Sequence, residues 1–157
     1  MYNTAHIVFA AISAFYFQAV WLCLAELFER WYQTGAFLPF FRSHAHIDTK
    51  RREPWLYPER TRLVIRDAIR KRYSYLPLWY TMFYEHELDG SPVIRPMLAH
   101  YPKDKDAFAL DNQMLLQDRL LVRPVMKQGV GKVDVYFPAL DDKKTGDLWY
   151  DVDTFQK

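Results

Sequence analysis

An arginine and two histidines stand close together in a stretch rich in aromatic residues. Arg42, His44 and His46 occupy alternate positions in residues 31–46, which read WYQTGAFLPFFRSHAH. A sugar offers hydroxyls to charged and imidazole groups and apolar ring faces to aromatics, so this mixture is typical of a carbohydrate-binding loop. For an arbitrary histidine pair, packing or capping within a loop is the commoner role. A metal site would need a third ligand at suitable spacing, and the neighbouring sequence offers none.

The composition limits the partners and the covalent chemistry of the chain. Its 157 residues suffice for one domain with a modest core. A formal net charge of +2 is too small to indicate a nucleic-acid partner. Cys23, the single cysteine, excludes an internal disulfide and a cysteine-based zinc site.

Residues 50–72 form a basic segment with nine Lys or Arg against three Asp or Glu. Taken alone, that excess would suggest a polyanion-binding patch. Arg62, Arg66 and Arg70 lie at four-residue spacing, however, which places them in one stripe on a helix. A solvated stripe is therefore the favoured interpretation, and no nucleic acid is expected to bind.

The chain opens with an apolar lead. Residues 7–25, IVFAAISAFYFQAVWLCLA, carry no charge. At about 19 residues the segment is just long enough to span a bilayer. No Lys or Arg precedes it and Glu26 follows it, a poor pattern for a targeting segment. A membrane anchor and a buried helix both fit this pattern.

Helical spacing dominates the middle of the chain. A short helix is predicted over residues 27–35, ending near Gly35, and residues 37–46 should then form a loop or an extended piece. A second helix should begin at residues 58–59, bend or split at Pro77, and end at Gly90. Four aromatics at helical spacing on its second half are predicted to be core: Trp79, Tyr80, Phe83 and Tyr84.

Strand patterns follow. Residues 91–97 are predicted to form a short buried strand between prolines, and residues 120–122 a compact apolar strand. Residues 133–137 alternate in the manner of a half-buried strand, and residues 148–150 are a further candidate. The sequence therefore predicts an α+β chain that contains part of an antiparallel sheet or sandwich.

Several motifs in register resemble glycoside hydrolase family 31. Residues 31–55 resemble the family's WYQ-G-A-x-x-PFFR-x-HAH-x-D-x-x-RREPW run. Later landmarks, in the family's order, are RDAIxxRYSYLP at 66–77, PVIRP at 92–96, LLVxPV at 120–125 and WYD at 149–151. The resemblance covers residues 25–157, most of the chain.

The resemblance implies a fold and a domain order. Residues 1–24 would be an apolar N-terminal helix unmatched to the family. Residues 25–101 would be the last units of a (β/α)8 barrel, with PVIRP as its last strand. Residues 102–157 would be the start of a β-sandwich domain.

The resemblance also implies an activity and a site. The family hydrolyses alpha-linked glucose with retention of configuration, and the resemblance is strongest to members that trim glucose from N-glycans. Those members work in the endoplasmic reticulum with a beta subunit as partner. By resemblance His44 bonds hydroxyls of the glucose being cleaved, Arg42 supports it, and His46 makes no substrate contact. No cofactor and no metal are implied.

Retaining glycosidases need two carboxyl groups, one as nucleophile and one as acid/base. The resemblance implies a W-x-D-M-N-E-like and a G-D-N-like motif for them, and neither occurs in the 157 residues. Gln117 stands where the family's L-G-D run has glycine before Asp118, and a G-A-D-x-G-G-F-like strand does not precede Glu26. We therefore expect a C-terminal fragment of a catalytic region that carries one wall of the site. A non-catalytic carbohydrate-binding remnant and a small membrane-anchored protein are the alternatives.

Overall fold

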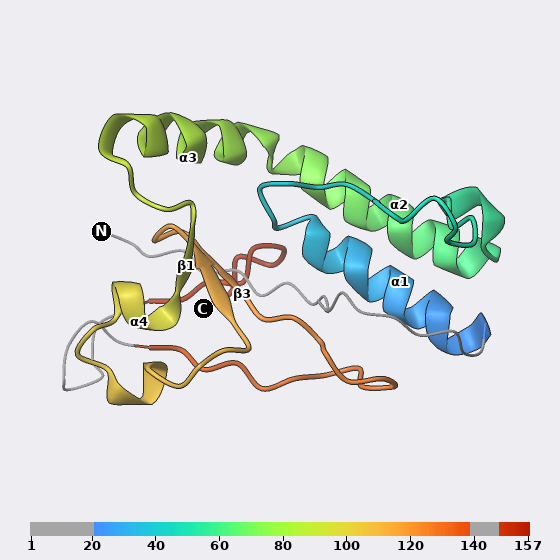
Figure 1. Ribbon diagram of the computed structural model, residues 1–157. Coiled ribbons are helices and arrows are strands. Elements are labelled where there is room, and N and C mark those ends of the chain that lie inside the picture. Colours follow the sequence, from blue (N-terminus) through green and yellow to red (C-terminus); the bar gives the residue numbers. More distant parts are fainter. Residues whose placement is uncertain (1–20, 139–147) are drawn as a thin grey trace.

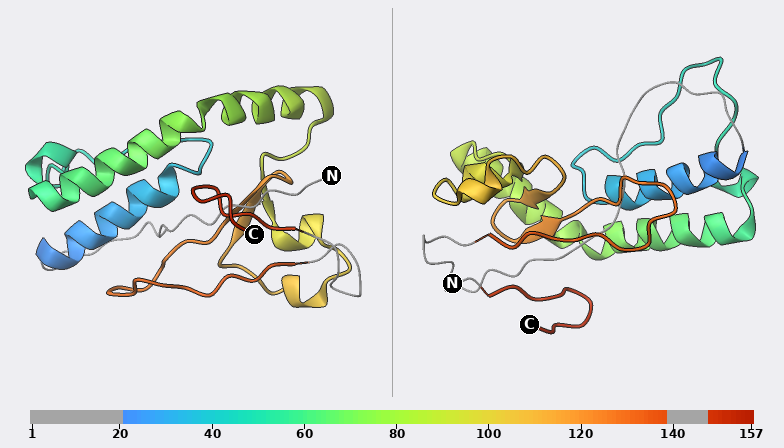
Figure 2. Two further views of the ribbon diagram at one scale, coloured as in Figure 1. Left: turned by 180° about the vertical axis from the view of Figure 1, so that it is seen from behind. Right: turned by 90° about the horizontal axis from the view of Figure 1, so that it is seen from below.

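The computed structural model describes residues 21–138 and 148–157, and it combines a helical part with a small sheet (Figure 1). The helical part contains α1 (Trp21–Gly35), α2 (Glu59–Ser74) and α3 (Leu76–Asp89). α1 lies alongside α2, and α3 continues beyond the end of α2 (Figures 1 and 2). Most of the apolar lead lies outside the described residues. No helix within the described ranges is long and apolar enough to cross a membrane.

The helix boundaries follow the predicted signals. α1 ends at Gly35, and α2 begins directly after Pro58, both as predicted. The predicted split at Pro77 is confirmed, because α2 ends at Ser74 and α3 begins at Leu76. Proline is tolerated in the first turn of α3, where its missing N–H would have had no partner inside the helix. Gly90 adopts φ 72° and caps α3 through a backbone bond to His86.

α1 and α2 run in the same direction. The Thr61 hydroxyl, near the start of α2, donates to Glu29 in the middle of α1 at 2.7 Å. Near their ends, Arg72 donates to the carbonyl of Ala36 at 3.1 Å. Residues 36–58 must therefore return along the length of the pair to connect the two helices (Figure 1).

The two faces of α2 differ as its spacing predicts. Its buried residues are Thr61, Ile65 and Ala68, at three- and four-residue intervals. The arginine stripe is exposed, and Asp67 pairs with Arg66 at 2.9 Å and with Arg70 at 3.9 Å. This confirms the interpretation of the stripe as a solvated face.

The prediction that four aromatics of α3 form core is wrong for three of them. Trp79 is only 2% exposed, but Tyr80, Tyr84 and Phe83 are exposed by 81%, 60% and 43%. Within the described residues α3 buries one face, which carries Trp79 and the fully buried Met82. Helical spacing alone did not show that only this face has neighbours.

The sheet contains three short antiparallel strands in the order β1-β2-β3. They are β1 (Ile94–Pro96), β2 (Met114–Leu116) and β3 (Leu120–Val122). A single helical turn, α4 (Met97–His100), follows β1 at once, and two 3-10 turns occur at η1 (Pro54–Leu56) and η2 (Lys105–Ala107). The predicted strand at 120–122 is confirmed. The buried strand predicted at 91–97 is confirmed only in part, because β1 covers residues 94–96 alone and these are half-buried or exposed. β2 is an element that the sequence patterns did not indicate.

Both faces of the sheet are covered. Leu116, Leu120 and Val122 pack into one hydrophobic cluster, whereas Leu115 and Leu121 pack into a second on the opposite face. The register pairs Leu116 with Leu120 and Leu115 with Leu121, so the clusters follow the alternation of side chains along a strand. Burial on both sides explains why Leu120–Val122 is an uninterrupted apolar run.

Two expectations for the sheet are corrected, and a third stays a prediction. β1, in the PVIRP run, pairs antiparallel with β2, whereas barrel strands pair parallel with their neighbours, so its place as the last barrel strand remains a prediction. Residues 133–137 and 148–150 form no strand in the described structure. Val135 and Trp149 are instead half-buried against the second cluster, so their apolar character serves packing without a strand ladder.

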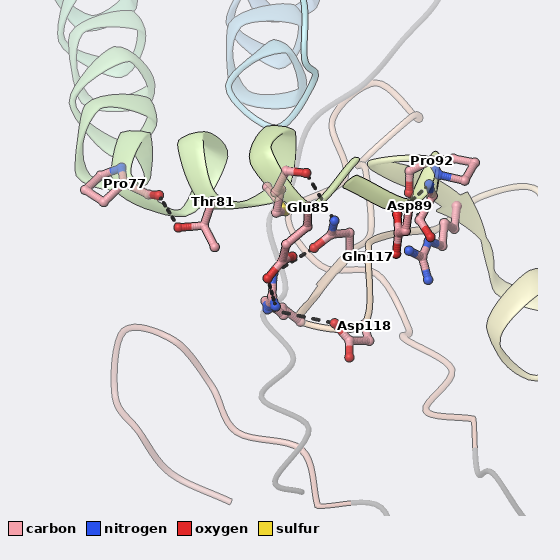
Figure 3. Close-up of polar contacts among 11 residues, drawn as sticks. Pro77, Thr81, Glu85, Asp89, Pro92, Gln117 and Asp118 are labelled. Atoms are coloured by element: carbon pink, nitrogen blue, oxygen red, sulfur yellow. Dashed lines mark hydrogen bonds and ion pairs between the residues drawn. The ribbon is translucent and has the colours of Figure 1, made fainter. Parts of the chain in front are cut away.

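Gln117 forms the corner between β2 and β3 in a left-handed backbone conformation, with φ 49°. This region disfavours side chains, which gives a physical reason for the glycine expected there. The buried Gln117 side chain donates to the carbonyl of Met82 at 3.2 Å and accepts from Arg119 at 2.7 Å. Arg119 also donates two hydrogen bonds, of 2.6 and 2.8 Å, to the carboxylate of Glu85 on α3 (Figure 3). The corner is thereby tied to α3.

Replacing Gln117 separates backbone strain from side-chain bonding. Gln117→Ala keeps the left-handed backbone and loses both side-chain bonds, so it should destabilise the chain by about 1–3 kcal/mol. Gln117→Gly loses the same bonds but relieves the strain, and should be about 1 kcal/mol more stable than the alanine variant. Urea unfolding of the two variants measures the difference. Equal stability would mean that the corner is unstrained.

The Glu85–Arg119 pair should make stability depend on pH. Bonding to Arg119 lowers the pKa of Glu85 below its ordinary value of 4.5. The carboxylate therefore stabilises the fold above the pKa of the unfolded chain, and this contribution is lost as pH falls through the folded pKa. The gap in melting temperature between the unmodified chain and Glu85→Gln should be widest at neutral pH and shrink below pH 4.5. Glu87→Gln, at an exposed glutamate of the same helix, is the control. A gap that stayed constant with pH would contradict this account.

Candidate functional site

The candidate site is the His44 loop, residues 42–53, which lies between the turn after α1 and the 3-10 turn η1. Arg42, His44 and His46 are all exposed there. Among the described residues, the side chains of Arg42 and His44 have no hydrogen-bond partner, and the structure does not bond them to each other. Both side chains are therefore free to meet a ligand.

The turn after α1 anchors the start of this loop in the core. Ala36 and Phe37 are 0% and 1% exposed, and both belong to the first hydrophobic cluster. Backbone bonds from Phe37 to Thr34 at 2.8 Å and from Leu38 to Gly35 at 3.0 Å close the turn. A side chain on Gly35 would approach the ring of Phe41 to 2.9 Å, so glycine is needed where the chain folds back onto α1.

Arg72, in the last turn of α2, binds the backbone of this turn. Its Nη1 donates to the carbonyls of Ala36 at 3.1 Å and Leu38 at 2.5 Å, and its Nη2 donates to Pro39 at 3.1 Å. The three carbonyls lie beyond Gly35, the last residue of α1, and a backbone carbonyl withdrawn from water needs a hydrogen-bond donor. A guanidinium is suited to this place because its rigid fork presents several donors at once.

The same guanidinium packs against aromatic rings. Its central carbon lies 4.2 Å from the ring centre of Trp79 on α3 and 5.7 Å from that of Phe41. Partial burial lowers the pKa of Arg72, but a guanidinium remains charged at neutral pH. No carboxylate within the described residues pairs with it, so carbonyl dipoles and ring faces compensate the charge.

A second arginine holds the far side of the loop. Arg52 donates to the carbonyl of His44 itself. Its neighbour Arg51 pairs with Glu53 at 2.8 Å, and this contact lowers the pKa of the Glu53 carboxyl. The backbone of His44 is therefore fixed from within the loop, while its imidazole faces outward.

His46 is engaged in a local turn. Its Nδ1 accepts from the backbone N–H of Asp48 at 3.2 Å and lies 3.3 Å from the Asp48 carboxylate. Thr49 closes the turn with a 2.9 Å bond to the His46 carbonyl. This arrangement uses the imidazole for loop structure. Within the described ranges, no three His, Cys, Asp or Glu gather as a metal site would require.

Sequence reasoning found the residues of the loop but missed the two arginines that hold it. Arg72 follows Ile65 and Ala68 by seven and four residues, the spacing of the buried face of α2. That spacing was the available signal, because it separates Arg72 from the solvated stripe. Nothing in the sequence indicated that Arg52 binds the carbonyl of His44.

Comparison with known families matches almost the whole chain. The model of the glycosyl hydrolases family 31 TIM-barrel domain matches residues 7–82. The model of the glycosyl hydrolase family 31 C-terminal domain matches residues 90–157. β1 lies in the second of these ranges, in agreement with its antiparallel pairing. The first range includes much of the apolar lead, which had been expected to lie outside the family.

Curated relatives agree with the family models. The chain is 53% identical over 130 residues to neutral alpha-glucosidase AB of Dictyostelium discoideum, a match that covers 83% of this chain and 14% of the relative. It is 51% identical over 132 residues to neutral alpha-glucosidase AB of Homo sapiens, covering 84% of this chain and 14% of that protein. The chain thus spans about one seventh of the length of these relatives.

Solved structures show the same relationship. A glucosidase II alpha subunit bound to alpha3-Glc2 superposes with a TM-score of 0.69 at 44% identity, covering 73% of this chain and 12% of that one. An ER glucosidase II heterodimer of the catalytic subunit with the binding domain of the regulatory subunit gives a TM-score of 0.68 at 42% identity, covering 74% of this chain and 13% of that one.

The motifs, the fold and the comparisons agree. Two family models cover consecutive parts of the chain in the order barrel, then C-terminal domain. The exposed Arg42 and His44 lie in the part that the barrel model covers. This chain belongs to glycoside hydrolase family 31.

Proposed function

We propose that this chain is the part of a retaining alpha-glucosidase that holds the substrate glucose through His44, with Arg42 in support. The observation that carries the proposal is the 53% identity to a neutral alpha-glucosidase, together with an exposed His44 whose carbonyl accepts a bond from Arg52 and whose loop follows a turn bound by Arg72. An imidazole can donate and accept hydrogen bonds, so it can bind a sugar hydroxyl. Arg42 lies two residues away in the same exposed loop and adds positive charge.

The fold and the partners belong to this proposal. The helices would be the last units of a (β/α)8 barrel, and the sheet would open a β-sandwich domain. The substrate would be an alpha-glucoside, such as the glucose-capped N-glycans trimmed by glucosidase II. A solved relative is an ER glucosidase II complex of the catalytic subunit with the binding domain of the regulatory subunit, which supports a beta subunit as partner and the endoplasmic reticulum as location.

The reacting groups are not among these residues. The nucleophile and acid/base motifs expected for the family do not occur in the 157 residues. A second candidate function is carbohydrate binding without turnover, for which the exposed Arg42 and His44 offer the contacts. Glycan binding by the 157-residue polypeptide, measured by calorimetry beside an activity assay, would distinguish the two.

The 157-residue polypeptide by itself should show no measurable glucosidase activity. Positioned loops cannot replace a nucleophile and an acid/base, whose combined loss costs many orders of magnitude in rate. Purified polypeptide assayed with an aryl alpha-glucoside provides the measurement, and His44→Ala is the control for contaminating enzyme. Turnover that His44→Ala abolished would show that the residues described here contain a complete catalytic site.

His44 should contribute to catalysis in a complete enzyme that carries this segment. Its hydrogen bond to a glucose hydroxyl can strengthen as positive charge develops on the ring in the transition state. Its loss should cost about 2–4 kcal/mol, or roughly thirty- to a thousandfold in kcat/KM. The test replaces the matching segment of the Dictyostelium relative with residues 21–157 and compares His44→Ala with His46→Ala. His46→Ala should act through stability alone.

Melting temperatures of both variants separate the two effects. If His44→Ala kept near-normal kcat/KM, or lost activity only in step with its melting temperature, His44 would be a structural residue. The assignment of His44 as the substrate-binding residue of the proposed function would then be withdrawn.

A further inference from the structure

We propose that Arg72 is the positioning residue of the site, which sets the place of His44 by holding the turn that leads into its loop. The inference rests on the proposed function, because it concerns the same site. Arg72 is remote from His44 in sequence and makes no contact with it among the described residues. Its action would pass through the backbone of residues 36–41.

The geometry makes Arg72 the link between three elements. Its side chain leaves the last turn of α2 and binds three carbonyls of the turn after α1. Its guanidinium lies against Trp79 of α3 at 4.2 Å. A shift of α2 relative to α1 would therefore move residues 36–39, and Arg42 follows only three residues after the last bonded carbonyl.

The imidazole of His44 needs such a support. Within the described residues no side chain holds it, so its position is that of its backbone. The backbone is held at two places, by Arg72 at the base of the loop and by Arg52 at the His44 carbonyl. Arg52 lies in the loop itself, whereas Arg72 belongs to α2, which packs against α1 and α3. Of the two arginines, Arg72 is the one whose side chain joins the start of the loop to α2 and α3.

Lysine could not take this role. The three acceptors surround a planar group that also stacks on an indole ring, and an ammonium offers neither the fork nor the flat face. Methionine would retain an unbranched apolar side chain of similar reach over Trp79 while it removes every donor. Both substitutions therefore change the hydrogen-bond donors at this position while they largely keep the packing of the side chain.

The experiment is a double-substitution cycle in the full-length Dictyostelium relative carrying residues 21–157 of this chain. Arg72→Met and Arg72→Lys are each made alone and combined with His44→Ala. Arg70→Met is the matched control, because Arg70 is exposed on the same helix and pairs only with nearby Asp67 at 3.9 Å. For each protein kcat, KM and melting temperature are measured.

We expect Arg72→Met to lower kcat by about tenfold or more with a smaller change in KM, since a misplaced contact is lost chiefly in the transition state. Arg72→Lys should recover less than half of the kcat that Arg72→Met loses. Arg70→Met should leave kcat unchanged. With His44 already replaced, Arg72→Met should lower kcat by less than about twofold, because residues that act through one another are not additive.

Two results would overturn the inference. If the losses from Arg72→Met and His44→Ala multiplied, Arg72 would act independently of His44. If Arg72→Lys matched the unmodified enzyme, the carbonyl fork would have no function. Both results leave the effect of His44→Ala intact and so spare the proposed function. If His44→Ala had no effect of its own, the proposed function and the role of Arg72 would fail together. Should Arg72→Met melt below the assay temperature, the lysine variant supports the same cycle.

Discussion

A charged guanidinium bound to three carbonyls of the turn after α1 is the interaction on which the rest of this structure depends. Arg72, in the last turn of α2, binds the turn after α1 and lies against the indole of Trp79 on α3, and so links three helices. Because α1 and α2 run in the same direction, the connection between them must return over their full length. A connection of this length needs contacts that fix its position, and Arg72 provides them at its first residues.

The same turn joins the helical part to the sheet. Ala36 and Phe37 share a hydrophobic cluster with Met82 of α3 and with Leu116 and Val122 of the sheet. The opposite end of α1 is also attached, since Glu26 accepts from the N–H of Gly129 at 2.9 Å. The His44 loop is thus an exposed segment on a buried base. This division suits a binding site, because a rigid base places side chains that must remain accessible to a ligand.

The corner at Gln117 shows how one departure from a family pattern can be accommodated. A left-handed backbone there disfavours a side chain, yet glutamine occupies it and binds α3 and Arg119. The strain of the backbone and the bonds of the side chain oppose each other, so the corner keeps its form with a different residue. The family motif has glycine at this position because the backbone there adopts a positive φ angle. Any other residue at this position must adopt the same angle.

The sequence by itself determined the local features of this protein. Glycine and proline set the ends of α1 and α3 and the break before α3, because their backbone restrictions act within a few residues. Residue types also drew attention to Arg42, His44 and His46, and the family resemblance selected His44 and Arg42 among them. Tertiary structure decided what depends on neighbours remote in sequence: that Tyr80 and Tyr84 are exposed, that β1 pairs antiparallel, and that residues 133–137 pack without forming a strand. The contacts of Arg72 belong to the second group, because its three acceptors lie more than thirty residues away and α1 and α2 must pack before these carbonyls reach it.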